Sequence, residues 1–446
     1  MSSAVMPLNE SDLRNCVELA LNEAHRLGAS EAEVGVSVDK GLSVTARMRD
    51  VETLEYHRDR GMGITVYRGK RKGSASTADL SAAAIRETVA KAYSIAGFTA
   101  EDPCAGLPDA EDLAKSIPDL DLNHPWDIEP DAARDLAINC EAAALAVDTR
   151  IANSEGATLS SHQGLRMFGN SLGFIAGYAS TSHSLSCSVI GQQNGEMQRD
   201  YWYSAVRDYR DLESAESVGE RAAKRTLERL NAQKLSTRVA PVMFVPELAR
   251  GFIGHFLSAI RGGSQYRRSS FLLDAAGQQV FPSWFNCIER PHIPKALGSA
   301  PFDAEGVTTR DRTLVDQGVL TGYVLSTYSA RKLGLKTTGN AGGVHNLIVK
   351  AGTDDFAAML KKMDTGLVVT ELMGSGVNGI TGDYSRGAAG FWVEKGVIAY
   401  PVHEITIAGN LKDMYQHIVA IGNDVDERGG VRTGSILLES MTIAGM

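Results

Sequence analysis

The second half of the chain is organised around the stretch Gly382-Asp383-Tyr384-Ser385-Arg386-Gly387-Ala388-Ala389-Gly390-Phe391-Trp392-Val393-Glu394. It belongs to a segment in which glycine recurs every few residues, from Gly366 to Gly409. Glycine lets the backbone turn sharply or lie close to another chain. The polar residues between the glycines therefore form either a tight structural turn or a set of ligand contacts, and the contact candidates are Asp383, Tyr384, Ser385 and Arg386. Asp383 and Arg386 form either a buried ion pair that holds the loop or a hydrogen-bonding clamp for a peptide backbone, and we expect a structural role for Asp383 and ligand contact for Arg386.

Length and composition set the class of protein. A chain of 446 residues suits two domains, and an apolar fraction of 43% is ordinary for a soluble globular protein. The net charge of −9 and the lack of a basic face argue against nucleic-acid binding. No apolar run reaches the length of about 18 residues that a membrane helix needs. The first ten residues lack the basic and apolar segments of a secretory signal.

Cysteine usage points to a reducing compartment. The five cysteines are scattered, odd in number and form no C-x-x-C pair; they are Cys16, Cys104, Cys140, Cys187 and Cys287. This pattern argues against a disulfide framework and against a zinc ribbon. We therefore expect a cytoplasmic protein without a membrane anchor.

The first half of the chain reads as an N-terminal α+β domain over residues 1–235. Helical spacing predicts a helix over 11–28 with Ser11 as its cap, and alternation from Glu33 to Tyr67 predicts a set of short antiparallel strands. Five of the thirteen prolines fall within 98–130, which predicts an extended connector. Further helices are expected over 81–96, 131–147 and 213–230, and further strands over 150–169, 173–190 and 197–206.

The second half, residues 236–446, reads as a β-rich domain. Strands are expected over 241–245, 307–313, 318–326 and 366–372, with helices over 247–260 and 354–362. The fold class predicted for the whole chain is α+β, with helices on an antiparallel sheet in the N-terminal domain and a C-terminal domain rich in curved antiparallel sheet.

Several blocks resemble one known family. Gly382–Trp392, followed by Tyr400–Leu411, closely resembles the C-terminal signature of the PmbA/TldE family, the partner branch of the TldD–TldE metallopeptidases. Gly61–Tyr67 with Lys72–Ser76 is similar to the family's N-terminal block, and Ser329–Lys336 is similar to a block of its C-terminal half. The resemblance covers nearly the whole chain and implies a metallopeptidase-like C-terminal domain.

The metal motif of the family is degenerate in this sequence. The catalytic branch carries a helix with the pattern H-E-x-x-x-H, whose histidines bind zinc and whose glutamate is the base. The corresponding stretch is Arg250-Gly251-Phe252-Ile253-Gly254-His255, so that only Gly254 and His255 match. Where the catalytic branch supplies a cysteine ligand near the C-terminus, this chain has Val431-Arg432-Thr433-Gly434.

Zinc chemistry argues against a metal centre at Arg250, Gly251 and His255. Catalytic zinc needs about three protein ligands, and only His255 remains. The Arg250 guanidinium has no free lone pair, and at about 4 Å it would repel the ion by about 8 kcal/mol at an effective dielectric constant of about 20. Without a glutamate at 251 no base is positioned to activate water. We expect no catalytic residue and no metal ligand here, with the zinc held by a partner chain.

Three readings of function stay open at this point. The resemblance implies a non-catalytic subunit that joins a TldD-type zinc peptidase and acts on unfolded or small peptides, such as peptide-antibiotic precursors and antitoxins. Such a chain completes the wall of a shared chamber, binds extended substrate by backbone pairing and forms a homodimer when alone. Alternatively the chain is itself a peptidase with an atypical metal site that uses His255 together with His345 or His403, although the neighbours His403 and Glu404 point to opposite faces of a strand. The third reading is a scaffold or regulatory protein that acts without any peptidase.

Overall fold

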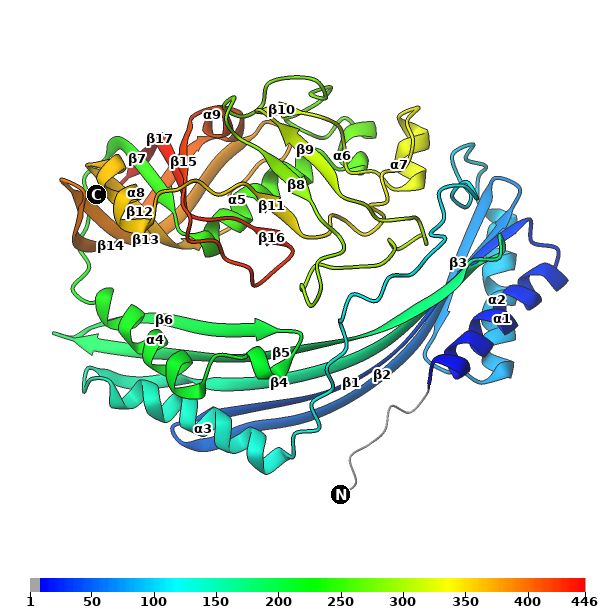
Figure 1. The fold of residues 1–446 in the computed structure, drawn as a ribbon, viewed down its shortest axis with the longest axis horizontal. Helices are drawn as coiled ribbons and strands as arrows, with labels where there is room; N and C mark the ends of the chain where they lie inside the picture. Colours follow the sequence, from blue (N-terminus) through cyan, green and yellow to red (C-terminus); the bar gives the residue numbers. More distant parts are fainter. Residues whose placement is uncertain (1–8, 446) are drawn as a thin grey trace.

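A six-stranded, antiparallel, curved sheet forms the first half of the chain in the computed structural model, which describes residues 9–445 (Figure 1). The expected lack of a secretory signal concerns residues 1–10, and residues 1–8 lie outside the described part. In the order in which they lie in the sheet, the strands are β3 (Arg71–Thr77), β2 (Asp50–Arg68), β1 (Glu31–Arg47), β4 (Ile151–Asn170), β5 (Ile175–Gln193) and β6 (Glu196–Val206).

Helices cover the outer, convex face of this sheet (Figure 1). They are α1 (Glu10–Arg26), α2 (Ala82–Phe98), α3 (Pro130–Ala146) and α4 (Ala215–Glu228). Alternation along the strands sends every second side chain to this face, so that Val34, Val36 and Val44 of β1 are buried beneath the helices. Each such valine contributes about 1.5–3 kcal/mol by its burial.

The inner, concave face of the sheet carries small polar side chains and faces the second half of the chain (Figure 1). Along β5 every second residue from Ser180 to Ser188 is a serine, and these serines all lie on the inner face. Their cross-strand partners on β4 include Thr158, Ser160 and Gly164. Small side chains leave room above the strands, whereas the apolar outer face leaves none. The outer face of the sheet therefore packs against helices, and the inner face has room for a pocket.

The strands of the first half are longer than the alternation predicted. We expected short strands between Glu33 and Tyr67, but β1 and β2 are continuous over 17 and 19 residues. The α1 cap also differs, because Asn9 and Asp12 form a capping box where Ser11 was expected. The other predicted helices of this half, over 81–96, 131–147 and 213–230, correspond to α2, α3 and α4.

The proline-rich segment runs from the first half of the chain to the second. Between Phe98 and Pro130 the described chain has no helix and no strand beyond an isolated bridge from Leu113 to Val307. Its polar groups bind helix α7 (Thr327–Lys332): Tyr328 donates to Asp102 at 2.7 Å, and Arg331 donates to the carbonyl of Leu107 at 2.7 Å. The predicted domain boundary after residue 235 falls between α4 and β7 and stays a prediction.

A closed sheet forms one layer of the second half. Its order is β14-β13-β12-β7-β17-β15, and β14 also pairs with β17, so that β14, β13, β12, β7 and β17 form a ring. Only the β12–β7 pair of this sheet is parallel. The strands are β7 (Arg238–Phe244), β12 (Gly366–Met373), β13 (Asp383–Glu394), β14 (Val397–Asn410), β15 (Ile418–Ile421) and β17 (Ile436–Ala444).

A smaller sheet and short helices complete the second half. The order of its strands is β10 (Val319–Leu320), β9 (Arg312–Asp316), β8 (Cys287–Glu289), β11 (Leu347–Val349) and β16 (Val431–Arg432). The expected strand pair at 307–313 and 318–326 is reduced to the short β9–β10 hairpin. The helices are α5 (Pro246–Ala259), α6 (Gly262–Tyr266), α7, α8 (Phe356–Met363) and α9 (Leu411–Gln416).

An aromatic core holds α5 between these layers. Phe252 and Phe256 of α5 pack on Tyr415, and the Tyr415 hydroxyl donates to the carbonyl of Phe252 at 2.9 Å. The structure confirms the predicted α+β class. Within residues 9–445, no helix combines the length and the apolar character that crossing a lipid bilayer requires.

Glu141 of α3 holds the β1–β2 hairpin, and this contact can be tested. Met48 and Arg49 at the turn have φ values of 50° and 66°, which are unfavourable for bulky side chains. The buried Glu141 carboxylate accepts their N–H groups at 2.8 and 2.7 Å. We expect Glu141→Ala to lower the free energy of unfolding by about 2 kcal/mol, measured by urea denaturation. Glu141→Gln keeps one acceptor and should lose less; an alanine variant as stable as the parent would contradict this role.

Candidate functional site

Arg250, which the resemblance aligns with the first histidine of the metal motif, bonds to several neighbouring groups. Helix α5 is α-helical over its whole length, and Pro246 occupies its first turn. One Arg250 nitrogen donates to the Tyr203 hydroxyl of β6 at 2.9 Å, and the other donates to the carbonyl of Arg428 at 2.8 Å. The guanidinium also lies 3.6 Å from the Asp426 carboxylate. It therefore links the two halves of the chain.

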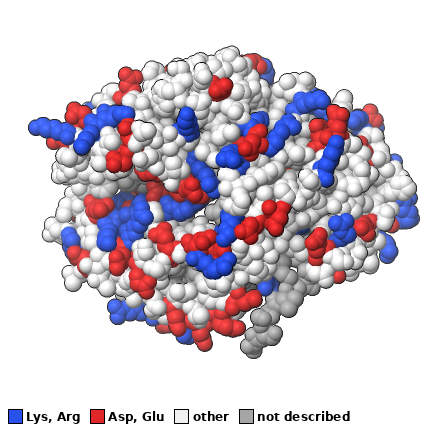
Figure 2. All heavy atoms as spheres, viewed as in Figure 1, with Lys and Arg blue, Asp and Glu red and all other residues white. Residues whose placement is uncertain are grey.

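Arg250 belongs to a set of charged and aromatic groups that we call the junction cluster, comprising Trp202, Tyr203, Glu247, Arg250, Asp426 and Arg428. The Cζ of Arg428 lies 4.1 Å from the centroid of the Trp202 ring and 4.3 Å from that of the Tyr203 ring. Its guanidinium also donates a hydrogen bond to the carbonyl of Tyr203 at 2.7 Å. It also donates to Asp426 at 2.9 Å and approaches Glu247 at 3.5 Å. Figure 2 shows charged side chains gathered along the hollow between the two halves.

His255 lies on a different side of α5 from Arg250. Residues five apart on an α-helix are rotated by about 500°, which is about 140° from a shared face. The His255 ring meets the Tyr384 ring at 6.1 Å between centroids and lines a pocket of about 400 Å³ together with Arg386. Burial, and then the positive charge of Arg386, lower the pKa of His255. Gly251 has no atom within 4 Å of the position where a Cβ would stand, so nothing fills the place of the missing glutamate.

The two segments that the resemblance assigns to a metal centre do meet in space. Gly429 lies against Arg250, with 3.0 Å from its would-be Cβ to a guanidinium nitrogen, and β16 follows directly. At this meeting point the guanidinium groups of Arg250 and Arg428 share the Asp426 carboxylate. In the described part of the chain, no group of three or more His, Cys, Asp or Glu residues is arranged to hold a metal ion. The residues present do not fit a catalytic zinc.

The histidines of the alternative site lie in separate surroundings. The backbone N–H of His345 donates to Glu289 at 2.6 Å, and burial lowers the pKa of the imidazole. His403 contacts Gln198 of β6 at 3.4 Å. Glu404 forms an exposed ion pair with Lys234 at 3.0 Å.

The predicted contact residues Asp383 to Arg386 form the first part of β13. This part is paired on both sides, because Ser385 lies opposite Ala408 of β14 and its N–H donates to the carbonyl of Gly376 at 2.7 Å. The backbone of this stretch is therefore hydrogen-bonded within the chain, which leaves the side chains as the groups available for contact with a ligand.

The side chains of β13 separate by the two-residue period of a strand. Asp383 is exposed and accepts from Thr381 at 2.6 Å and from Asn410 at 3.2 Å, so it forms no pair with Arg386. Ser385 is exposed on the same face. Tyr384 is buried, and burial raises its pKa to about 12, while Arg386 reaches the pocket beside His255.

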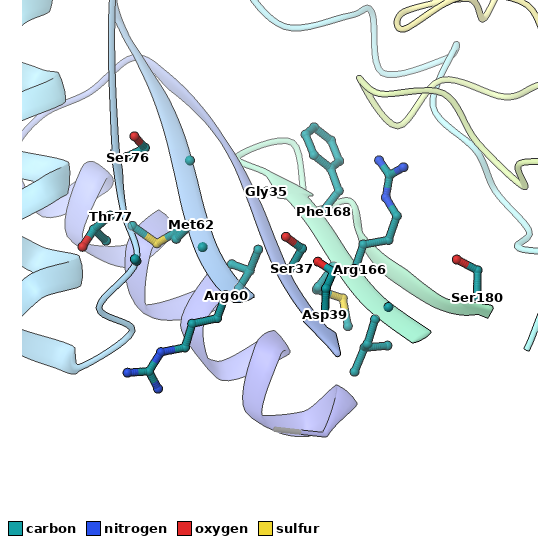
Figure 3. A pocket seen from close by; sticks show the side chains of 17 residues that line it. Gly35, Ser37, Asp39, Arg60, Met62, Ser76, Thr77, Arg166, Phe168 and Ser180 are labelled. Atoms are coloured by element: carbon teal, nitrogen blue, oxygen red, sulfur yellow. The ribbon is translucent and has the colours of Figure 1, made fainter. Parts of the chain in front are cut away.

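A larger pocket, of about 740 Å³, lies on the inner face of the first sheet (Figure 3). Its floor includes Gly35 of β1 and Gly63 of β2, which lie directly opposite each other. Neither glycine has an atom within 4 Å of the place of a Cβ, and neither has a positive φ. Arg166 and Phe168 of β4 stand at one side of this trough (Figure 3). Bare backbone is thus exposed over adjacent strands without a steric need for glycine.

Family models match nearly the whole chain. They describe PmbA/TldA metallopeptidases and cover domain 1 at residues 32–96, the central domain at 123–230 and the C-terminal domain at 237–445. These matches define the class of the protein as a PmbA/TldA metallopeptidase fold. The chain is 54% identical to the metalloprotease PmbA of Escherichia coli O157:H7 over 97% of both chains. It belongs to the PmbA/TldE family of metallopeptidases.

Other relatives and solved structures share the architecture. A metalloprotease TldD homolog of Haemophilus influenzae is 22% identical, with 82% of this chain and 80% of that protein covered. A candidate modulator of DNA gyrase from Bacteroides thetaiotaomicron superposes with a TM-score of 0.92 at 26% identity, covering 97% and 99% of the two chains. TldE of Thermococcus kodakarensis has the same fold, with a TM-score of 0.81 at 20% identity over 97% of this chain and 100% of that one.

Sequence reasoning missed most of the junction cluster. Trp202 and Tyr203 lie in β6, while Asp426 and Arg428 come from a segment more than 200 residues away, so no local spacing connects them. The pair Gly35 and Gly63 was also missed, although two glycines in alternating strand sequences were a usable signal.

Asp426 provides a pH-dependent test of the junction cluster. Burial alone would raise its pKa, but the Arg428 hydrogen bonds and the charges of Arg250 and Arg428 hold the pKa below its usual value. The stabilisation is therefore complete above the unfolded-state pKa of about 4 and is lost as pH falls through the lower folded-state pKa. We expect Asp426→Asn to lower the free energy of unfolding by about 3 kcal/mol at neutral pH.

Urea denaturation at neutral pH and at about pH 3 measures this difference, which should shrink in acid. Glu427→Gln is the matched control, because Glu427 is exposed and pairs only with Arg432 at 3.6 Å. An equal loss at both pH values would show that the charge of Asp426 does not contribute.

Proposed function

We propose that this chain is the non-catalytic subunit of a TldD–TldE zinc peptidase, in which a TldD-type partner holds the metal. The observation that carries the proposal is the position of Arg250. Its guanidinium is bonded to Tyr203, Arg428 and Asp426, so it cannot swing away to vacate a metal site without breaking contacts between the two halves. The chain supplies chamber wall and substrate contacts, and the partner supplies the base and the metal-bound water.

Unfolded or small peptides are the proposed substrates. The inner face of the first sheet supports this, because it is polar, faces the second half and includes the trough over Gly35 and Gly63. An extended peptide is narrow enough to lie over bare backbone, where a protein with fixed bulky side chains would clash. Peptide-antibiotic precursors and antitoxins are substrates of this kind.

The outer edge of β2 is a surface suited to a partner chain. β3 pairs with β2 only from Met62 onward, so residues 50–61 pair with β1 alone in the described structure. Leu54 and Tyr56 are exposed here beside the buried core residues Val44 and Leu42. Exposed apolar edge strands invite pairing with another chain. The similarity to a TldD homolog supports a partner of the same architecture, and a second copy can occupy the edge when the chain is alone.

The expected location is the cytoplasm, where all five cysteines, which are free in the structure, stay reduced.

Metal content and peptide hydrolysis, measured for the chain alone and with a TldD-type partner, test the proposed function. We expect no bound zinc and no hydrolysis alone, and hydrolysis with about one zinc per heterodimer in the mixture. Inductively coupled plasma mass spectrometry measures the metal, and mass spectrometry of an unstructured peptide measures cleavage. Stoichiometric zinc with turnover by the chain alone would overturn the proposal.

Gly63→Val tests the peptide path over the trough. No atom lies within 4 Å of the added Cβ and valine favours strands, so thermal stability should be unchanged or higher. Peptide cleavage by the mixed complex should nevertheless fall about tenfold, because the side chain fills the floor. Gly322→Val is the matched control, since Gly322 also has open space around it and lies outside the pocket. Unchanged cleavage by a folded Gly63→Val variant would exclude this path.

A further inference from the structure

The pocket beside His255 has an unusual charge balance. It lies between α5, α6, the loop at 374–379 and β13, and its volume is about 400 Å³. Its lining includes the cation Arg386 and the imidazole of His255, but no aspartate or glutamate. The hydroxyls of Ser258 and Ser264 already donate to backbone carbonyls at 3.0 and 2.8 Å. The charge of Arg386 is therefore not balanced within the pocket.

Arg386 has no acidic partner elsewhere in the described chain. Its Nε is buried without a hydrogen bond. The guanidinium does interact with the Tyr384 phenol, but the pKa of this phenol is raised to about 12, so the phenol is neutral and does not balance the charge. The carboxylate nearest in sequence, Asp383, points to the opposite face of β13 and is bonded to Thr381 and Asn410. A partly buried charge without a partner is costly in a folded protein.

A binding site can carry the free-energy cost of an unpaired arginine when a negatively charged ligand pairs with that arginine on binding. The arginine fork binds a carboxylate through two parallel N–H···O bonds, which gives direction as well as affinity. The neutral imidazole of His255 can donate a further hydrogen bond to the same anion. The pocket is small, so it accepts the end of a chain or one side chain and excludes a folded surface.

We propose that Arg386 and His255 form a carboxylate pocket that binds the C-terminal carboxylate of a peptide substrate. The inference rests on the proposed peptide-binding role and adds the chemical class of the group that is recognised. It also gives β13 a function through its side chains, since its backbone is paired within the chain. A peptide whose C-terminal carboxylate is bound in this pocket can extend away from it in only one chain direction.

Fluorescence anisotropy with the purified full-length chain tests this pocket. The probe is a labelled octapeptide of Gly, Ala and Ser, offered either as the free acid or as the C-terminal amide. We expect the amide to bind about tenfold more weakly, and Arg386→Gln to weaken the acid by a similar factor without affecting the amide. Arg290→Gln, which removes an exposed arginine outside the pocket, should leave both affinities unchanged.

A third peptide separates the two sources of a carboxylate. The same amide with one internal aspartate should still bind weakly if the terminus is recognised, and tight binding of this peptide would overturn the C-terminal assignment. Equal affinity for acid and amide would overturn the carboxylate pocket while leaving peptide binding by the chain intact. Failure of the proposed function is distinct from this, because it would appear as zinc-dependent cleavage without the partner.

Thermal unfolding keeps the test independent of folding defects. Replacing Arg386 by glutamine removes the free-energy cost of a partly buried, unpaired charge from the folded state. The Arg386→Gln variant should therefore unfold at the same temperature as the parent or at a higher one. A marked loss of stability would mean that Arg386 has a structural partner, and would also overturn the proposal.

Discussion

The contact of Arg428 with the edge of β6 fixes how the two halves of this protein face each other. The guanidinium binds the carbonyl of Tyr203 and stacks on Trp202 and Tyr203, which point to opposite faces of the sheet. It therefore covers the edge from outside and blocks further strand pairing there. Asp426 and Glu247 hold the arginine in place through ion pairs that are shielded from solvent. A second contact joins the halves elsewhere on the sheet, where Phe302 of the second half packs on Phe174 and on Tyr178 of β5.

The same cluster also determines what the first turns of α5 can do, because it holds an arginine there. A metal site at α5 would need ligands where the structure has Arg250, and this arginine carries part of the contact between the halves. A histidine at position 250 alone would not complete a zinc site, because Gly251 offers no base and the stretch Val431–Gly434 offers no cysteine. One helix thus contributes a structural contact on one side and a pocket residue on the other.

The glycines of β13 serve close packing more than ligand access. A Cβ at Gly390 would stand 1.9 Å from the carbonyl of Val368 on the neighbouring strand, which forbids any side chain there. At Gly35 and Gly63 the situation is reversed, since nothing occupies the space of a side chain. A glycine in the sequence can therefore mark a place where two strands leave no room for a side chain, as at Gly390, or a place where the space above the strand is empty, as at Gly63. The positions of the neighbouring strands distinguish the two cases.

The sequence alone determined the fold class, most helices and the family, because periodicity and capping depend on residues a few positions apart. It could also have predicted the full length of β1, since Val34, Val38, Leu42 and Val44 keep one phase across Gly41. The tertiary structure alone decided which distant residues meet, namely those of the junction cluster and those around the trough over Gly35 and Gly63. These depend on contacts between segments up to 225 residues apart, and a local sequence pattern does not indicate which distant segment will lie at the edge of a curved sheet.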